Sequence, residues 1–351
     1  MLDDNRLFMH VRDFLLVYLP QRKNYSEHTA KSYRIALDQL FDFIKAQRNI
    51  SIDKITFEML TADTLNAWLD SIEKDRGCSI STRNQRRASI GAFLKYAAEV
   101  DVTTVMFRKE LKKVPAKKPN QIELVKHMSE TAISVLLETP DASTPMGLRD
   151  RLFMMLIYDT AARCQEMLRL RIKDLRLGES PTALLHGKGN KIRVVPIRPK
   201  TVLHIREYLK VFHPTESEYS EQYLFYSVLR GAKRKLSPAW ARKTVSEYGI
   251  DARKVCIEVH ESVHCHLLRH SRAMHLYQRG MDLTLLAQLL GHAHLETVLV
   301  YAHADTEHKR QAIAAASAQN DPLSKKLNSE RFTVSDEEQL KILCGLRPAR
   351  R

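Results

Sequence analysis

Residues 266–301 read HLLRHSRAMHLYQRGMDLTLLAQLLGHAHLETVLVY, and this stretch decides how the second half of the chain is interpreted. His266 and Arg269 are three positions apart, so a helix places both side chains on one face. His292 follows a glycine at the expected end of a helix, and Tyr301 comes nine positions later. Imidazole and guanidinium groups bind phosphate oxygens, and a phenol can attack phosphorus. The stretch therefore predicts a helical frame that carries phosphate-binding groups and a candidate nucleophile.

The segments around this stretch predict a mainly helical domain with a small β-sheet, an α+β domain over residues 121–320. Apolar residues at helical spacing indicate helices at 200–211, 237–248, 266–278 and 283–290. Residues 183–197, ALLHGKGNKIRVVPI, place two apolar segments on either side of a glycine-rich turn, which predicts a β-hairpin. Helices and one hairpin are thus expected to hold the candidate site.

Two further candidate residues lie upstream of residue 266. Arg163 stands near a predicted helix in TAARCQEMLRLRIKDL, and Glu166 follows it three residues later. A guanidinium buried between the flanking apolar segments needs an anionic partner, either Glu166 or a ligand. Lys188 lies at the tip of the predicted hairpin, and Lys191 is a rival basic residue in the same turn.

The composition narrows the class of protein. The 351 residues include 56 Lys and Arg and 41 Asp and Glu, a formal net charge of +15. This excess favours a polyanionic partner, and nucleic acid is the leading candidate because phosphate contacts release counterions. The five cysteines contain no C-x-x-C pair, which favours reduced thiols over a disulfide framework. The amino terminus is no signal peptide, and no apolar run approaches the ~20 residues of a membrane span. We expect a cytoplasmic, nucleoid-associated protein with no membrane partner.

Residues 1–107 predict a separate helical domain, because apolar residues recur at helical spacing in four stretches. The fourth stretch, from Ser81 to Tyr96, has a basic face. Residues 108–120, RKELKKVPAKKPN, are typical of a basic, extended linker. We expect DNA contacts in both segments, at Arg83, Arg86, Arg87, Lys95, Lys112, Lys113, Lys117 and Lys118. A basic helix face that is merely solvated is the alternative.

Cutting a DNA phosphodiester without metal or ATP places definite demands on a site. The transition state gathers negative charge on its equatorial oxygens, which two guanidiniums can meet with fixed charge. A side-chain oxygen must attack, because a covalent intermediate retains the bond energy. The departing 5′ oxygen needs a positioned acid. The chain offers candidates for these tasks, in this order: Arg163, Lys188, His266, Arg269, His292 and Tyr301.

These motifs, in this order, resemble the Xer- and integrase-like tyrosine recombinases of the phage integrase family. The matching segments are TAARCQE (160–166), GKGNK (187–191), HLLRH (266–270), and LGH (290–292) before Tyr301. The resemblance covers roughly residues 8–310 and includes STRNQRRASIGAFLKYA, which is similar to the helical core-binding domain of the family. Ala161 departs from the pattern, because the family usually has glycine there.

The resemblance implies a role for each side chain of the cleavage step. Arg163 and Arg269 hold the scissile phosphate. Tyr301 attacks it, giving a 3′-phosphotyrosine link and a free 5′-hydroxyl. Lys188 protonates the departing 5′ oxygen.

The remaining roles follow from the same resemblance. His266 hydrogen-bonds the phosphate and assists proton transfer at the tyrosine, His292 donates to a non-bridging oxygen, and Glu166 orients its neighbours. The implied partners are double-stranded DNA with specific recombination sites and, on that DNA, a homo-tetramer that passes through a Holliday junction. An accessory DNA-bending protein or a partner recombinase is a further implied partner, and no cofactor is implied.

Other interpretations stay open on the sequence alone. A sequence-specific DNA-binding protein without catalysis fits the charge, and a type IB topoisomerase shares the tyrosine chemistry. Residues 264–270 include three histidines and a cysteine, but they lack the H-E-x-x-H pattern of a zinc site. Tyr277 is a rival nucleophile on an apolar helix face, and His270 is expected to face away from the phosphate. Residues 321–351 predict a tail with a short helix, packed on its own domain or exchanged between subunits.

Overall fold

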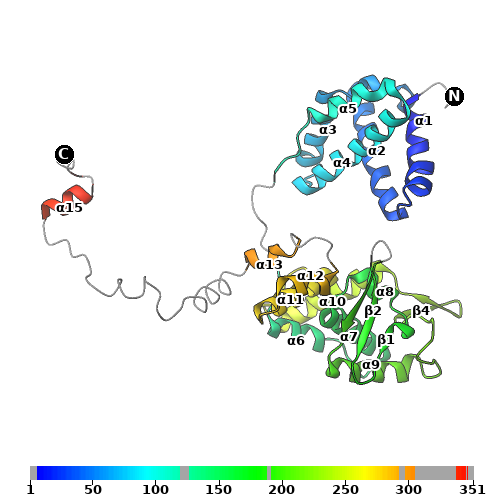
Figure 1. Cartoon of the computed structure of the whole chain (residues 1–351), viewed down its shortest axis with the longest axis vertical. Coiled ribbons are helices and arrows are strands. Elements are labelled where there is room, and N and C mark those ends of the chain that lie inside the picture. Colours follow the sequence, from blue (N-terminus) through cyan, green and yellow to red (C-terminus); the bar gives the residue numbers. More distant parts are fainter. Residues whose placement is uncertain are drawn as a thin grey trace. The chain divides into compact units, whose positions relative to one another are not determined.

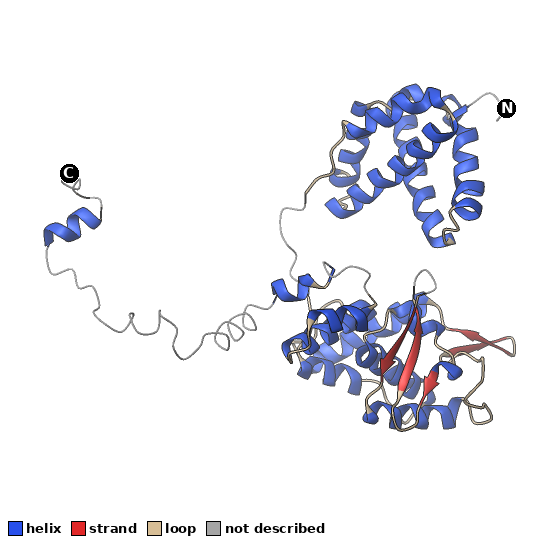
Figure 2. Ribbon diagram, viewed as in Figure 1, coloured by secondary structure: helices blue, strands red, loops and turns tan. Residues whose placement is uncertain are grey.

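The computed structural model describes residues 6–118, 126–187, 191–291, 297–304, 337–344 and 346. The chain divides into two compact units, Met1–Ile122 and Glu123–Arg351, called here the amino-terminal and carboxy-terminal units. Among the described residues, helices make up most of both units, and every strand belongs to the second unit (Figure 2). Among the described residues, no helix combines the length and the apolar character needed to cross a bilayer. The predicted fold class, mainly helical with a small sheet, is confirmed.

The amino-terminal unit is entirely helical over its described residues. Its elements are α1 (Arg6–Asp13), a π-helix (Phe14–Arg22), α2 (Glu27–Arg48), two 3₁₀ turns (Ile52–Lys54 and Phe57–Met59), α3 (Ala62–Lys74), α4 (Ile80–Val100), a 3₁₀ turn (Val102–Thr104) and α5 (Val105–Lys112). Ser26, Thr61 and Ser79 cap the first turns of α2, α3 and α4 with their hydroxyl groups. Helix α4 contacts α2, α3 and α5, and a core rich in aromatic rings fills the space between them.

Residues 108–118 differ from the extended linker expected from the sequence. Helix α5 continues to Lys112, and Leu111 and Val114 are buried in the core of the amino-terminal unit. Asn84 on α4 then exchanges two hydrogen bonds with the backbone of Lys117, at 2.7 and 3.1 Å. The segment packs onto α4 because its apolar residues recur at helical spacing and complete that core.

The carboxy-terminal unit places helices around a three-stranded sheet (Figure 1). Its elements are α6 (Glu130–Glu138), α7 (Pro145–Thr160), α8 (Cys164–Arg169), a 3₁₀ turn (Ile172–Asp174), β1 (Leu175–Arg176), β2 (Thr182–His186), β3 (Ile192–Pro196), α9 (Pro199–Phe212), β4 (Tyr226–Leu229), β5 (Ala232–Lys235), α10 (Pro238–Val255), α11 (Cys265–Gln278), α12 (Leu283–Leu290), α13 (Leu299–Ala304) and α15 (Glu337–Leu343). Helix α7 is buried along most of its length and packs against α9 and α11.

The predicted hairpin is confirmed as β2 and β3, which pair antiparallel with Leu184 opposite Val194. Strand β1 adds to the other edge of β2. A second hairpin, β4–β5, was not predicted. It turns at Arg230 and Gly231, both with positive φ (51° and 76°), as a tight two-residue hairpin turn requires.

Candidate active site

The junction between α7 and α8 places Arg163 at the surface of the carboxy-terminal core. Helix α7 is closed by Ala161 in the left-handed conformation (φ 50°), and Arg163 is the extended residue that begins α8. Glu166, in the first turn of α8, accepts hydrogen bonds from the Arg163 backbone N (2.8 Å) and Nη1 (2.9 Å). Arg163 therefore binds Glu166, one of the two anionic partners predicted for it from the sequence.

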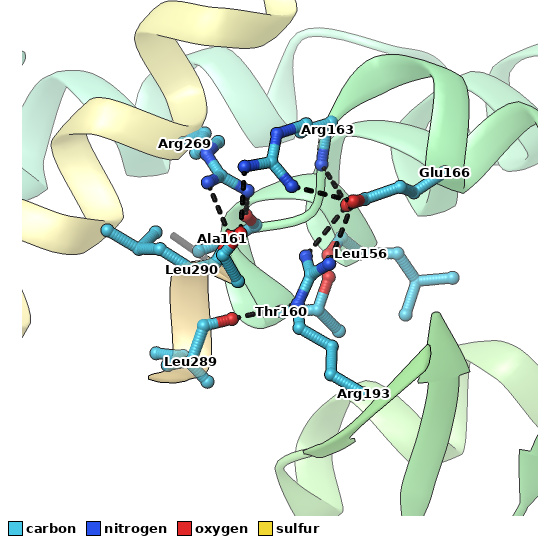
Figure 3. Close-up of polar contacts among 10 residues, drawn as sticks. Leu156, Thr160, Ala161, Arg163, Glu166, Arg193, Arg269, Leu289 and Leu290 are labelled. Carbon is cyan, nitrogen blue, oxygen red and sulfur yellow. Dashed lines mark hydrogen bonds and ion pairs between the residues drawn. The ribbon is translucent and has the colours of Figure 1, made fainter. Parts of the chain in front are cut away.

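Arg193 on β3 is a site residue that the sequence interpretation missed. Its Nη1 and Nη2 donate to Oε1 and Oε2 of Glu166, both at 2.7 Å. Figure 3 shows the Glu166 carboxylate between the guanidiniums of Arg163 and Arg193. Burial alone would raise the pKa of Glu166, but the hydrogen bonds from Arg193 and Arg163 outweigh it and lower that pKa. The carboxylate is therefore ionised and holds both arginines.

The end of α12 completes what we call the arginine cluster, which consists of Arg163, Arg193, Arg269 and Glu166. Three consecutive carbonyls there each accept a hydrogen bond from a different arginine. The pairs are Leu289 O with Arg193 Nε (3.0 Å), Leu290 O with Arg269 Nη2 (2.7 Å) and Gly291 O with Arg163 Nη2 (3.2 Å). The partial negative charge at a helix carboxyl end favours cations in this position. Arg269 also donates from Nη1 to the carbonyl of Ala161 (2.6 Å). It therefore links α11 to the end of α7 and to the end of α12.

Tyr301 lies on α13 and is 1% exposed. Its Oη is 2.7 Å from Nδ1 of His270, whose ring centroid is 4.3 Å from that of His266. The expectation that His270 faces away from the candidate site is wrong, because residues four apart on α11 lie side by side. That same spacing was visible in the sequence and could have identified His270 as a neighbour of His266.

The charges in the carboxy-terminal unit perturb one another. Burial lowers the pKa of Arg269 to about 10, and the nearby cations Arg163 and Arg193 act in the same direction. Burial and then Arg269 lower the pKa of His266, so its imidazole is neutral at pH 7. Burial raises the pKa of Tyr301 to about 12, against the pull of Arg269. Cations this close together are suited to an anionic ligand such as a phosphate diester.

Comparisons with known proteins decide the family. The model of the phage integrase family matches residues 126–308, and that of the phage integrase N-terminal SAM-like domain matches residues 13–101. The chain belongs to the phage integrase family. It is a tyrosine recombinase.

Full-length relatives agree with this assignment. The y4rC protein of Sinorhizobium fredii is 30% identical over 93% of this chain and 94% of its own length. Tyrosine recombinase XerD of Staphylococcus epidermidis is 27% identical over 84% of this chain and 94% of its own length. Among solved structures, the fold is similar to that of XerH bound to palindromic difH substrate in a post-cleavage complex. The TM-score is 0.64 at 24% identity, over 83% of this chain and 81% of that one. A lambda integrase dimer bound to a COC′ core site gives a TM-score of 0.59 at 15% identity, over 86% and 96% of the two chains.

In this tyrosine recombinase, five of the seven predicted site residues lie in the described part of the chain. Arg163, Glu166 and Arg269 meet in the arginine cluster, whereas His266 and Tyr301 both flank His270. Lys188 and His292 lie outside the described residues. Over the described part of the chain, no group of three or more His, Cys, Asp or Glu side chains is arranged to hold a metal ion.

The basic residues predicted to bind DNA in the amino-terminal unit fall into two groups. Arg83 is 2% exposed and donates to the carbonyl of Pro115 (3.3 Å), so its guanidinium is directed at the protein, and the DNA contact predicted for it stays a prediction. Arg86 bonds to Gln39, and Arg87 bonds to the carbonyls of residues 111 and 114. Lys117 pairs with Glu73. The exposed members are Lys95, Lys112, Lys113 and Lys118, and their DNA contacts stay predictions.

Proposed function

We propose that this tyrosine recombinase cleaves and rejoins duplex DNA at specific sites through a covalent 3′-phosphotyrosine intermediate on Tyr301. The observation that carries the proposal is the arginine cluster. Three guanidiniums converge around one carboxylate and one helix end, in the unit that also holds Tyr301. A scissile phosphate supplies the negative charge that such a group of cations favours.

Arg163 and Arg269 are the proposed phosphate ligands. The Arg163 side chain is 35% exposed, and its hydrogen bonds to Glu166 and Gly291 fix the direction of its guanidinium. Arg269 is fixed by two backbone carbonyls. The Arg163 guanidinium has five N–H groups, so its contacts with Glu166 and Gly291 leave donors for a non-bridging oxygen. Donors positioned before the reaction stabilise the charge that develops in the transition state.

The nucleophile is the Tyr301 hydroxyl, which must lose its proton as it attacks. Its pKa, raised to about 12, keeps the phenol neutral at rest. His270 Nδ1 is at hydrogen-bonding distance from the phenol oxygen, and the neutral His266 lies beside His270. These imidazoles are the groups placed to take up the proton. The attack forms the bond from tyrosine oxygen to phosphorus and breaks the bond to the 5′ oxygen, which Lys188 protonates, while His292 donates to a non-bridging oxygen.

Rejoining reverses these steps with the 5′-hydroxyl of another strand. Four subunits on two DNA sites would exchange strands in pairs through a Holliday junction. The DNA complexes of XerH and lambda integrase, which share this fold, support double-stranded DNA as the partner. The net charge of +15 supports it as well. We place the reaction at the nucleoid in the cytoplasm, with an accessory DNA-bending protein or a partner recombinase as a further component.

The test is a suicide DNA substrate, nicked so that the cleaved strand diffuses away and the covalent protein accumulates. We expect the wild type to form the adduct in EDTA. Tyr301→Phe should form none and still bind the site within about twofold, because the change removes one hydroxyl and no phosphate-binding charge. Binding without an adduct in the wild type would favour a DNA-binding protein that lacks catalysis. Cleavage of any plasmid with little sequence preference would favour a type IB topoisomerase.

A further inference from the structure

Arg193 differs from the other two arginines of the cluster in how its donors are used. All three of its guanidinium nitrogens donate to protein acceptors, two to Glu166 and one to the carbonyl of Leu289. Its side chain is 12% exposed, about a third of the value for Arg163. A guanidinium engaged in this way is suited to holding protein groups in place.

Three chain segments meet at Arg193. It lies on β3, it bonds to Glu166 on α8, and it bonds to the last turn of α12. The chain is also close-packed around it. A Cβ on Gly291 would lie 3.1 Å from Arg193 Cδ and Nη1, and a Cβ on Gly187 would lie 3.3 Å from Oε1 of Glu166. Glycine at these two positions lets the end of α12 and the end of β2 approach the ion pair.

Glu166 has two arginines to satisfy its charge. With Arg193 bound to both carboxylate oxygens, Arg163 shares them through one Nη1 and its backbone N. Without Arg193, the buried carboxylate would have to draw more of its compensation from Arg163, because an ionised group out of water requires full pairing. The Arg163 guanidinium would then turn from the phosphate toward Glu166.

We infer that Arg193 is a positioning residue for DNA cleavage, which offsets the charge of Glu166 so that Arg163 stays directed at the scissile phosphate. This inference rests on the proposed function. It predicts that the effect of losing Arg193 depends on the charge at position 166.

A double-mutant cycle tests this dependence. Arg193→Met and Glu166→Gln are made singly and together, and the single-turnover cleavage rate is measured at saturating DNA, well below the thermal unfolding midpoint of each variant. We expect Arg193→Met to slow cleavage about 100-fold, the size of effect that a misplacement of about 1 Å can cause. Site binding should change by less than about threefold, since Arg193 has few donors left for DNA. In the Glu166→Gln background, the same change should slow cleavage by less than about threefold, because residues in contact do not act additively.

Arg198→Met is the matched control. Arg198 follows β3 and also binds a buried carboxylate, Asp159, from Nε (2.5 Å) and backbone N (3.0 Å), but this pair is not part of the arginine cluster. We expect it to lower the unfolding midpoint and leave the cleavage rate nearly unchanged. Should Arg193→Met fail to fold, Arg193→Lys enters the same cycle, because it keeps the charge and loses the bidentate contact. We expect Arg193→Lys to cleave DNA more slowly than the wild type. When it is combined with Glu166→Gln, it should cause no further loss of rate.

Two results would overturn the inference. One is wild-type cleavage by the folded Arg193 variants, and the other is an equal defect with Glu166 and with Gln at position 166. A wild type that forms no covalent adduct at all would instead refute the proposed function, so the two failures are distinguishable.

Discussion

Helix α4 of the amino-terminal unit and the arginine cluster of the carboxy-terminal unit are both basic in sequence, but their arginines are used differently. On α4, Arg83 and Arg87 donate to the backbone at and just beyond the end of α5. In the cluster, all three arginines donate to the end of one helix, and two of them, Arg163 and Arg193, also bind Glu166. The arginines of α4 hold the segment after α5 against that helix, whereas the arginine cluster concentrates positive charge at one place.

A basic motif alone therefore does not identify a ligand-binding surface. Arginines at helical spacing predicted a DNA-facing side of α4, yet Arg83 is buried under the segment that follows α5. Whether basic residues can bind an anionic ligand depends on how many guanidiniums lie close together once the protein's own carbonyls and carboxylates have bound them. Four substitutions test this difference, in order of decreasing effect.

Arg269→Met should have the largest effect on cleavage. It removes a fixed cation from the proposed phosphate site, and the loss of one preorganised donor slows a reaction about 100- to 1,000-fold. The carbonyls of Ala161 and Leu290 lose their donors, which costs about 1–3 kcal/mol of stability. Single-turnover cleavage and denaturant unfolding measure the two effects. A folded variant with a rate within tenfold of the wild type would contradict the assignment.

Lys188→Ala should slow cleavage about 100-fold or more on ordinary DNA, as the loss of a general acid does. With a 5′-phosphorothiolate substrate the defect should be much smaller, because a thiolate leaves without being protonated. Lys191→Ala serves as the control from the same turn, and we expect it to cleave both substrates normally. An equal defect of Lys188→Ala on both substrates would count against the acid role.

Arg87→Met should act on stability and leave the chemical step unchanged. The carbonyls of Leu111 and Val114 lose their donor, so the free energy of unfolding should fall by about 1–3 kcal/mol. The cleavage rate at saturating DNA should change by less than about twofold, since these contacts of Arg87 lie within the amino-terminal unit and the arginine cluster belongs to the other unit. Urea unfolding and single-turnover cleavage provide the check. A large rate defect in the folded variant would show that the contrast between the two regions is false.

Lys95→Met should have the smallest effect. Its side chain is 59% exposed and pairs with Glu99 in a surface contact of little energy, so stability should stay within about 0.5 kcal/mol. If Lys95 contacts a DNA phosphate as predicted, the slope of log affinity against log salt should fall by about 1. Titrations at several salt concentrations measure this slope. An unchanged slope and affinity would mean that this side of α4 is merely solvated.

Much of the fold follows from local patterns. The spacing of apolar residues and the glycine-rich turn predicted the helices of the carboxy-terminal unit and the β2–β3 hairpin, because these depend on the chain nearby. The motifs also pointed to Arg163, Glu166 and Arg269, which meet in space.

Other features depend on contacts between distant segments and could not be read locally. Arg193 sits 27 positions after Glu166 in a strand, so nothing near it in sequence reveals that ion pair. Arg83 was predicted to be exposed, but the segment after α5, which lies 32 positions later in the chain, covers it. His270 was a different kind of miss, because its spacing from His266 was available and was assigned to the wrong face.

Mass spectrometry of the trapped covalent complex would identify the tyrosine that attacks the DNA. After digestion with nuclease and trypsin, Tyr301 and its rival Tyr277 fall in different peptides, residues 280–309 and 273–279. We predict a nucleotide remnant on Tyr301 in the first peptide, attached through a 3′ phosphate. A remnant on Tyr277, or adduct formation that persists in Tyr301→Phe, would show that Tyr301 is not the nucleophile.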